Sequence, residues 1–149
     1  RLFDAGANEA RINLEAYNRD LFRKLCPAKD YDLTMRSIED AVKIFGFNKV
    51  SSSMIVGVGE SDRDLIEGVE MLSRLGVVPT LHPLDTFPGY KKRLGRVLDV
   101  PFGRPSADRL ISLAWLHKEA LVSNKLDPRM LRTTCPGCTA CSLMPIVDF

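Results

Sequence analysis

Apolar and polar positions repeat along the first half of the chain with the periods of strands and helices. Residues 9–16 alternate between polar and apolar side chains, which predicts a strand with one polar face. Residues 50–56 and 77–84 are rich in β-branched and small side chains, as in strands buried on both faces. We therefore expect three strands before residue 85.

Helical spacing of apolar residues separates these strands and returns later in the chain. The pattern is best defined after Ser61, which forms a capping box with Asp64 at the start of a helix. Gly46 and Gly76 would end two of the helices. The expected helices are a short one at 18–25 and longer ones at 32–45, 61–75 and 105–121.

The order of these elements predicts the fold class. Strands alternating with helices through short connections require right-handed crossovers and a parallel sheet, so we expect an α/β fold. Residues 85–104 have no period and are rich in proline, glycine and basic side chains. We expect a loop there, leading to a C-terminal helix and tail.

Size and composition fit a single globular core. The chain has 149 residues, of which 45% are hydrophobic and 27% charged. Its net charge of +2 gives no reason to expect nucleic acid or a membrane surface as a partner. Because no apolar run approaches the ~20 residues of a membrane helix and no secretory leader is visible, we expect a cytoplasmic protein.

The polar face of the first strand carries candidate ligand-binding residues. Asn13 and Glu15 are two residues apart, so their side chains project from the same face. An amide and a carboxylate offer the donors and acceptors that ribose hydroxyls and an amino group bind. A polar pair on a solvated strand end has the same pattern, so both interpretations stay open.

Small side chains on one face of the second strand would admit a flat ring. Ser53, Ile55 and Gly57 share this face, and Gly57 permits close approach of a ligand. Glu60 follows at a helix start, where the helix dipole alone also favours a carboxylate. The Gly-Val-Gly sequence matches neither the phosphate-binding loop nor the three-glycine dinucleotide motif, so a plain turn is the alternative.

The chain has two histidines. His82 shares a face of the third strand with Thr80 and could bind a ligand or transfer a proton. His117 falls within the last expected helix. A lone histidine more often has a structural role, and we expect this role for His117.

Three of the four cysteines are crowded near the end of the chain, at Cys135, Cys138 and Cys141. Two-residue gaps are typical of metal or cluster ligands, and the run resembles that of bacterial ferredoxins except that Met144 replaces the fourth cysteine. We expect an iron–sulfur cluster, whose fourth ligand would come from elsewhere, from the substrate, or be absent. Zinc is the alternative, and its fourth ligand could be Cys26 or His117. Cys26 is expected to be an inert buried thiol.

Three motifs in this order resemble the radical S-adenosylmethionine enzymes, in their biotin-synthase-like branch. They are Ala-Arg-Ile-Asn-Leu-Glu at 10–15, Leu-Phe-Arg-Lys-Leu-Cys-Pro at 21–27 and Val-Ser-Ser-Ser-Met-Ile-Val-Gly-Val-Gly-Glu at 50–60. The last is similar to the family's Gly-x-Ile-x-Gly-x-x-Glu motif, with Ser53 at the first glycine position. The resemblance covers about residues 6–84.

The resemblance implies a cofactor site for S-adenosylmethionine along three strands. The first would hold its ribose and methionyl parts, the second its adenosyl group, and the third would flank the adenine or the substrate. Some relatives bind the methionine carboxylate with an arginine, but the corresponding position here is Thr34, with Arg36 nearby. The cofactor-binding residues implied are Asn13, Glu15, Ser53, Ile55, Gly57, Glu60 and His82.

The resemblance also implies the second half of a TIM-type barrel over residues 1–84, followed by a connection at 85–104 and a helix with the cysteine tail at 105–149. The family's Cys-x3-Cys-x2-Cys, which binds the [4Fe–4S] cluster that cleaves the cofactor, is absent from this chain. Residues 2–6 look like the end of a helix. We therefore expect part of a longer enzyme, inactive without the amino-terminal half of its barrel, with an open inner face and open sheet edges.

The function implied is hydrogen abstraction from a small-molecule substrate by a 5′-deoxyadenosyl radical, with an auxiliary cluster at the cysteine tail. One alternative is a small, non-catalytic α/β binding module with a structural zinc site in the tail. Another is a flavodoxin-like or phosphate-binding protein that uses Gly57 and Gly59 at a helix N-terminus.

Overall fold

A computed structural model describes residues 1–132 and 141–147 of the chain. The strands β1 (Ala10–Arg11), β2 (Val50–Val56) and β3 (Val77–Pro83) form a parallel sheet in the order β1-β2-β3. This confirms the expected α/β class and parallel pairing. A closed barrel is not present among the described residues, so the TIM-type half barrel stays a prediction.

The four helices expected from the sequence are present, and each begins at a side-chain cap. Ser61 and Asp64 form the expected capping box. The side chains of the caps accept hydrogen bonds from backbone N–H groups of the first helical turn. The helices and their caps are α1 (Arg19–Leu25) after Asn18, α2 (Tyr31–Phe45) after Asp30, α3 (Asp62–Arg74) after Ser61, and α5 (Ala107–Ser123) after Ser106.

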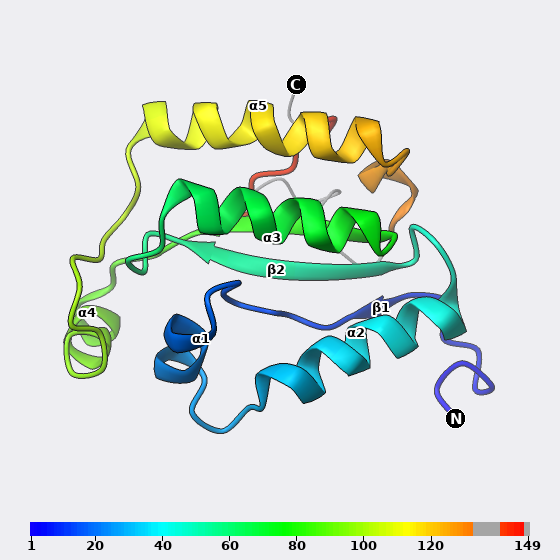
Figure 1. Ribbon diagram of the computed structural model, residues 1–149, viewed down its shortest axis with the longest axis horizontal. Coiled ribbons are helices and arrows are strands. Elements are labelled where there is room, and N and C mark those ends of the chain that lie inside the picture. Colours follow the sequence, from blue (N-terminus) through cyan, green and yellow to red (C-terminus); the bar gives the residue numbers. More distant parts are fainter. Residues whose placement is uncertain (133–140, 148–149) are drawn as a thin grey trace.

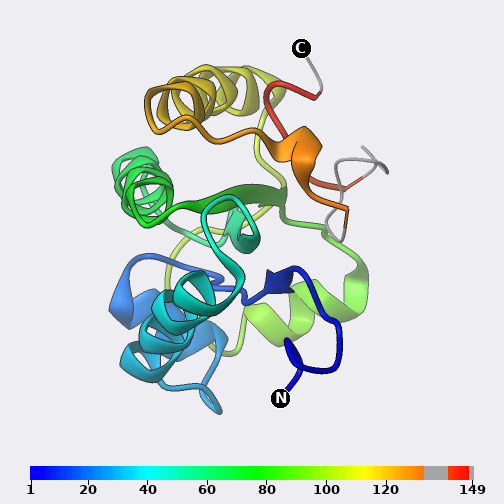
Figure 2. The same ribbon diagram turned by 90° about the vertical axis from the view of Figure 1, so that its right-hand side faces the viewer.

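The main hydrophobic core lies between one face of the sheet and the helices α2, α3 and α5. Figure 2 shows α2 and α3 together on this side of the sheet and a further helix, α4 (Pro88–Leu94), on the other. Alternate residues of β2 and β3 point into the core because successive strand side chains face opposite ways. Fully buried members include Ile38, Met54, Val56, Leu72 and Leu81.

The first strand is shorter than expected because its backbone contains a bulge. Ile12 and Glu15 donate backbone hydrogen bonds to the carbonyls of Ser51 and Ser53, so three residue steps on one strand match two on β2. Glu15 takes the left-handed backbone conformation, with φ of 65°. Beyond Ala10–Arg11, pairing resumes only as an isolated bridge from Glu15 to Met54.

The expectation of an irregular segment at 85–104 is wrong over the seven residues of α4, Pro88–Leu94. Within α4 only Leu94 is buried. Phe87 and Tyr90 are exposed, so the segment lacks the apolar period that would have predicted a helix. A short 3₁₀ helix, η1 (Pro128–Met130), follows α5.

The outer edge of β3 is partly covered, contrary to the open edges expected of a half barrel. Leu143 donates a backbone hydrogen bond of 2.7 Å to the carbonyl of Leu81 and forms an antiparallel bridge there. The neighbouring Met144 is fully buried in a cluster with Val78 and Leu121. Leu143 and Met144 therefore pack against the last strand of the sheet.

The opening turn has the hydrogen bonds of a helix end, as its sequence predicts. Ala7 and Gly6 donate to the carbonyls of Leu2 and Phe3, and Gly6 has φ of 95°.

Among the described residues, no helix has the length and apolar character needed to cross a membrane.

Candidate functional site

Polar residues from all three strands converge on the face of the sheet opposite the main core. We call Arg11, Asn13, Ser53, Thr80 and His82 the inner-face cluster. The Arg11 guanidinium donates to Asn13 Oδ1 at 3.1 Å, contacts Ser53 Oγ, and lies 3.0 Å from His82 Nε2. Ser53 Oγ and Thr80 Oγ1 are hydrogen-bonded at 2.6 Å. One arginine therefore connects the first strand to the third.

The inner face is only partly open to water, because Arg11 is exposed and Asn13 and His82 are half-buried, whereas the two hydroxyl residues of the cluster are buried. Ser53 and Thr80 are these two residues. Ser51, which pairs with Arg11 across the sheet, is also buried, and its Oγ has no hydrogen-bond partner among the described residues. A buried hydroxyl without a partner is unusual and marks a place where a polar ligand group would be accepted.

The environment of His82 favours its neutral form. Burial is the main cause that lowers its pKa, and the Arg11 cation lowers it further. Because a guanidinium can only donate hydrogen bonds, Nε2 of His82 must be the acceptor, which places the ring proton on Nδ1. Glu15 and a hydrogen bond with the backbone of Cys141 oppose the shift.

Cys141 is thus the cysteine of the tail that the structure connects to the inner face, through its backbone and His82. Its residue is exposed. The other two expected ligands, Cys135 and Cys138, lie outside the described residues. Within the described ranges no group of three histidine, cysteine or acidic side chains could hold a metal ion.

A cavity of about 280 Å³, which we call the mouth pocket, opens at the carboxyl ends of the strands. Glu15 and Ile55, from the first and second strands, both line it. Leu84, directly after β3, and Leu94 of α4 contribute apolar walls. In Figure 1 this is the end of the sheet toward which the β2 arrow points, beside α1 and α4. Parallel sheets bind ligands at this edge.

Two of the charged residues that line the mouth pocket have partners. Glu15 pairs with Lys29 at 3.2 Å, and Lys24 pairs with Asp99. A third charged residue, Arg93 of α4, also lines the pocket. The remaining rim residue of chemical interest, Cys26, is half-buried, and burial raises the pKa of its thiol, as expected of an inert cysteine.

Gly57 and Glu60 lie in a turn beside this pocket and are held by the chain itself. The Glu60 carboxylate, with 4% of its side chain exposed, accepts backbone hydrogen bonds from Gly57 at 2.8 Å and Val58 at 2.7 Å. Arg109 of α5 donates to the same carboxylate at 2.9 Å. These contacts occupy N–H groups that a phosphate would need, which argues against the phosphate-binding alternative.

Gly57 does provide a close approach, but to the backbone of residue 103. A Cβ atom at Gly57 would lie 2.1 Å from the Gly103 carbonyl oxygen, and φ of Gly57 is 105°. Gly103 also donates a backbone hydrogen bond of 2.8 Å to the Gly57 carbonyl. A role of Gly57 in ligand binding stays a prediction.

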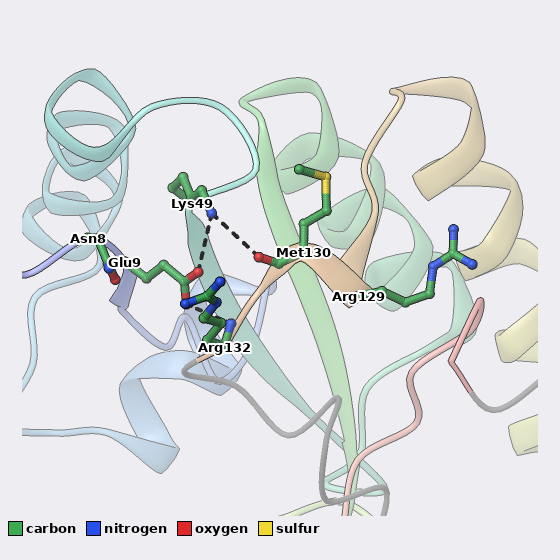
Figure 3. Close-up of a pocket in the computed structure, with 6 residues that line it drawn as sticks. All are labelled: Asn8, Glu9, Lys49, Arg129, Met130 and Arg132. Carbon is green, nitrogen blue, oxygen red and sulfur yellow. Dashed lines mark hydrogen bonds and ion pairs between the residues drawn. The ribbon is translucent and has the colours of Figure 1, made fainter.

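A second cavity, of about 470 Å³, lies at the opposite, amino-terminal edge of the sheet (Figure 3). The Glu9 carboxylate is 2% exposed and accepts a hydrogen bond of 2.8 Å from the backbone N–H of Arg132. It also lies 3.4 Å from Lys49 Nζ. Lys49 also donates a hydrogen bond of 3.4 Å to the Met130 carbonyl. These contacts tie the segment after α5 to the start of β1, and we assign them a structural role.

His117 agrees with the structural role expected for it. The ring is fully buried on α5, and Nε2 lies 3.1 Å from the carbonyl oxygen of Pro79 in β3. Burial lowers the pKa of His117 to about 4. The ring therefore joins the last helix to the sheet.

The structure sorts the residues expected at the cofactor site into three neighbouring groups. Asn13, Ser53 and His82 meet in the inner-face cluster, Glu15 and Ile55 line the mouth pocket, and Gly57 and Glu60 form the turn. Sequence reasoning missed Arg11, although its place on the same polar face as Asn13 was a usable signal. It also missed Arg93, because its helix was not expected.

Comparisons with known proteins give one relative. The chain is 33% identical over 89 residues to the bacteriochlorophyllide c C-7(1)-hydroxylase of Chlorobaculum limnaeum. This relative is an enzyme. The match covers 57% of this chain but 22% of the relative, so the chain spans about a fifth of the length of that protein. No family model matches the chain, and no solved structure matches it significantly.

Proposed function

We propose that this chain is part of a radical S-adenosylmethionine enzyme, and that it holds the cofactor between the inner-face cluster and the mouth pocket. The observation that carries the proposal is that Glu15 and Ile55, singled out on different strands, line one cavity. This cavity lies at the strand edge where parallel sheets bind ligands. The motif resemblance at 10–15 and 50–60 points to the same cofactor.

The residues present fit the chemistry of the cofactor. A nucleoside needs an apolar surface for its ring and acceptors for its hydroxyls, and Ile55 and the Glu15 carboxylate offer these in one pocket. The unpartnered Ser51 hydroxyl and the Arg11 guanidinium lie on the same face of the sheet. When bound, S-adenosylmethionine would supply, after one-electron reduction by an iron–sulfur cluster, a 5′-deoxyadenosyl radical that removes a hydrogen atom from substrate.

The relative supports this reaction class. Its name describes hydroxylation at carbon, which requires a carbon–hydrogen bond to be broken. Hydrogen abstraction does this. The name of the relative gives a bacteriochlorophyllide as its substrate, and we propose a substrate of comparable chemistry here.

The chain's own residues would bind, orient and shield the reactants. Glu15 would accept hydrogen bonds from hydroxyl or amino groups at the rim of the mouth pocket. His82 is neutral and accepts from Arg11, so it would hold the guanidinium on the inner face rather than move a proton. The buried Leu84 and Leu94 would help to exclude water from the reacting groups.

Binding of S-adenosylhomocysteine or S-adenosylmethionine, measured by isothermal titration calorimetry, tests the proposal. Glu15→Gln removes a charged acceptor and is expected to weaken binding about tenfold or more, the worth of one charge-assisted hydrogen bond. Glu39→Gln on the exposed side of α2 removes the same charge far from the pocket and should leave affinity unchanged.

Two results would contradict the proposal. One is a wild-type protein that binds neither compound at millimolar concentration. The other is equal affinity in the Glu15→Gln and Glu39→Gln proteins, which would show that the carboxylate at the pocket has no part in binding.

A further inference from the structure

The segment between β3 and α5 concentrates the positive charge of the protein. Residues 85–104 contain five basic and two acidic side chains, a net charge of +3, whereas the whole chain has +2. The rest of the chain is therefore slightly negative. Three of the basic residues, Lys91, Lys92 and Arg93, lie in the last turn of α4.

The same segment exposes large apolar side chains. Phe87 is 66% exposed and Tyr90 58% exposed, while Val97 and Val100 are also exposed. Two residues of the segment anchor it to the rest of the protein, because Leu94 and Leu98 are buried in a cluster with Val58 and Leu84. Exposed rings among cations, on a segment with buried anchors, form a surface suited to an amphiphilic anion.

Arg93 is the residue that brings this charge to the mouth pocket. Of the charged residues lining the pocket, Glu15 and Lys24 have ion-pair partners. Arg93 has no carboxylate partner within the part of the chain that the structure describes. Tyr90, one helical turn before Leu94, lines the pocket beside it. The cavity thus combines apolar walls, a ring and one uncompensated guanidinium.

We infer that α4 forms the substrate side of the site and selects a rigid apolar molecule with a carboxylate. The ring system would lie against Tyr90 and the apolar walls, and the carboxylate would accept hydrogen bonds from Arg93, whose planar fork matches it. A cavity of about 280 Å³ is large enough for part of such a molecule, and the rest would extend over α4. This inference rests on the proposed function, because it takes the mouth pocket as part of the active site.

Three fluorescent probes with the same ring test the inference: 1-pyrenebutyrate, 1-pyrenebutanol and 1-pyrenebutylamine. Each is titrated with the protein in the absence of S-adenosylmethionine. The acid is expected to bind at least about tenfold more tightly than the alcohol, and the amine more weakly than both. Equal binding of the acid and the alcohol would overturn the inference, because Arg93 would then select nothing.

Matched variants on α4 separate a local contact from a general field. Arg93→Gln should weaken binding of pyrenebutyrate about tenfold and leave pyrenebutanol unchanged. Lys92→Gln removes the same charge from a residue outside the pocket lining, and should cost less than about threefold. Tyr90→Ala should weaken the acid and the alcohol alike, whereas Trp115→Ala, an exposed ring on α5 that does not line the pocket, should weaken neither.

Equal losses for Arg93→Gln and Lys92→Gln would overturn the inference. A second contradicting result has two parts: the protein sediments with anionic phosphatidylglycerol vesicles, and it does not bind pyrenebutyrate selectively. In that case α4 would be a membrane-surface contact. Failure of the proposed function gives a different result. In that case Glu15→Gln would not weaken binding of S-adenosylhomocysteine, while Arg93→Gln would still weaken binding of pyrenebutyrate.

Discussion

The guanidinium of Arg11 lies 3.0 Å from Nε2 of His82, although 71 positions separate the two residues in the sequence. The same guanidinium contacts Ser53 on the strand between them. Because adjacent parallel strands lie about 4.8 Å apart, only a side chain as long as arginine can reach across the middle strand. Arg11 thereby makes one polar surface out of three strands.

Removal of this cation should raise the pKa of His82. The positive charge of Arg11 disfavours the imidazolium, so Arg11→Gln should move the His82 pKa upward, toward its ordinary value. The shift can be followed by NMR titration of the ring protons, with His117 as the internal reference. An unchanged or lower pKa of His82 would show that the guanidinium does not act on the ring.

His117 should make stability depend on pH. Its pKa falls from 6.5 to about 4 in the folded protein, so the unfolded chain binds the proton more readily between these values. The neutral His117 ring makes its full contribution to the free energy of unfolding above pH 6.5. This contribution, about 3 kcal/mol, is lost as the pH falls toward 4. Urea unfolding of wild type and His117→Gln between pH 7 and 5 should show a steeper loss in wild type; parallel curves would contradict this.

Gly57→Ala should be strongly destabilising, because the new Cβ meets the Gly103 carbonyl at 2.1 Å in addition to the strain of a positive φ. Gly46→Ala is the matched control: its φ is 95°, and no atom lies within 4 Å of the added Cβ. We expect the control to lose about 1 kcal/mol of unfolding free energy and Gly57→Ala to lose more than about 2 kcal/mol. If both variants lose the same free energy of unfolding, measured by thermal unfolding, the loop near Gly103 can move to accommodate the new Cβ without destabilising the fold.

Glu60→Gln separates support of the turn from binding of a ligand. The change weakens a nearly buried carboxylate that holds two backbone N–H groups and Arg109, and should cost about 2–3 kcal/mol. Glu67→Gln breaks an exposed i,i+4 pair with Arg63 on α3, and should cost less than about 0.5 kcal/mol. If Glu60→Gln leaves the unfolding midpoint unchanged but abolishes cofactor binding, its role is with the ligand.

The cysteine tail should bind iron. Anaerobically purified protein is expected to contain iron and acid-labile sulfide, and Cys141→Ser should lower both because it removes one of three thiolates at cluster spacing. Cys26→Ser is the control, because Cys26 lines the mouth pocket and has a thiol of raised pKa. Stoichiometric zinc without sulfide would instead support the non-catalytic binding module.

Local chemistry determined the elements with strong signals. Apolar spacing placed β2 and β3 and four helices, and the side chains of Ser61 and Asp64, three positions apart, marked a helix start that depends only on local sequence. Alternation also placed Asn13 and Ser53 on the faces that meet. These features depend on neighbours in the sequence, so the sequence alone was sufficient.

The helix α4 could not be predicted because its stability comes from elsewhere. It exposes Tyr90 and its cations and buries little beyond Leu94, whose cluster includes residues as far away in the sequence as Phe22 and Val58. The bulge before Glu15 has the same origin, since it is defined by the register of β2 and by a hydrogen bond from the Leu14 backbone to the Ser52 hydroxyl.

For the site, the sequence determined which side chains face inward and which chemistry they bring. Only the tertiary structure decided that Arg11 reaches His82, that Glu60 binds the chain's own turn, and that Arg93 enters the pocket beside Glu15. The physical reason is that each of these contacts joins groups through space. Their geometry depends on strand register, helix placement and the burial of both partners at once.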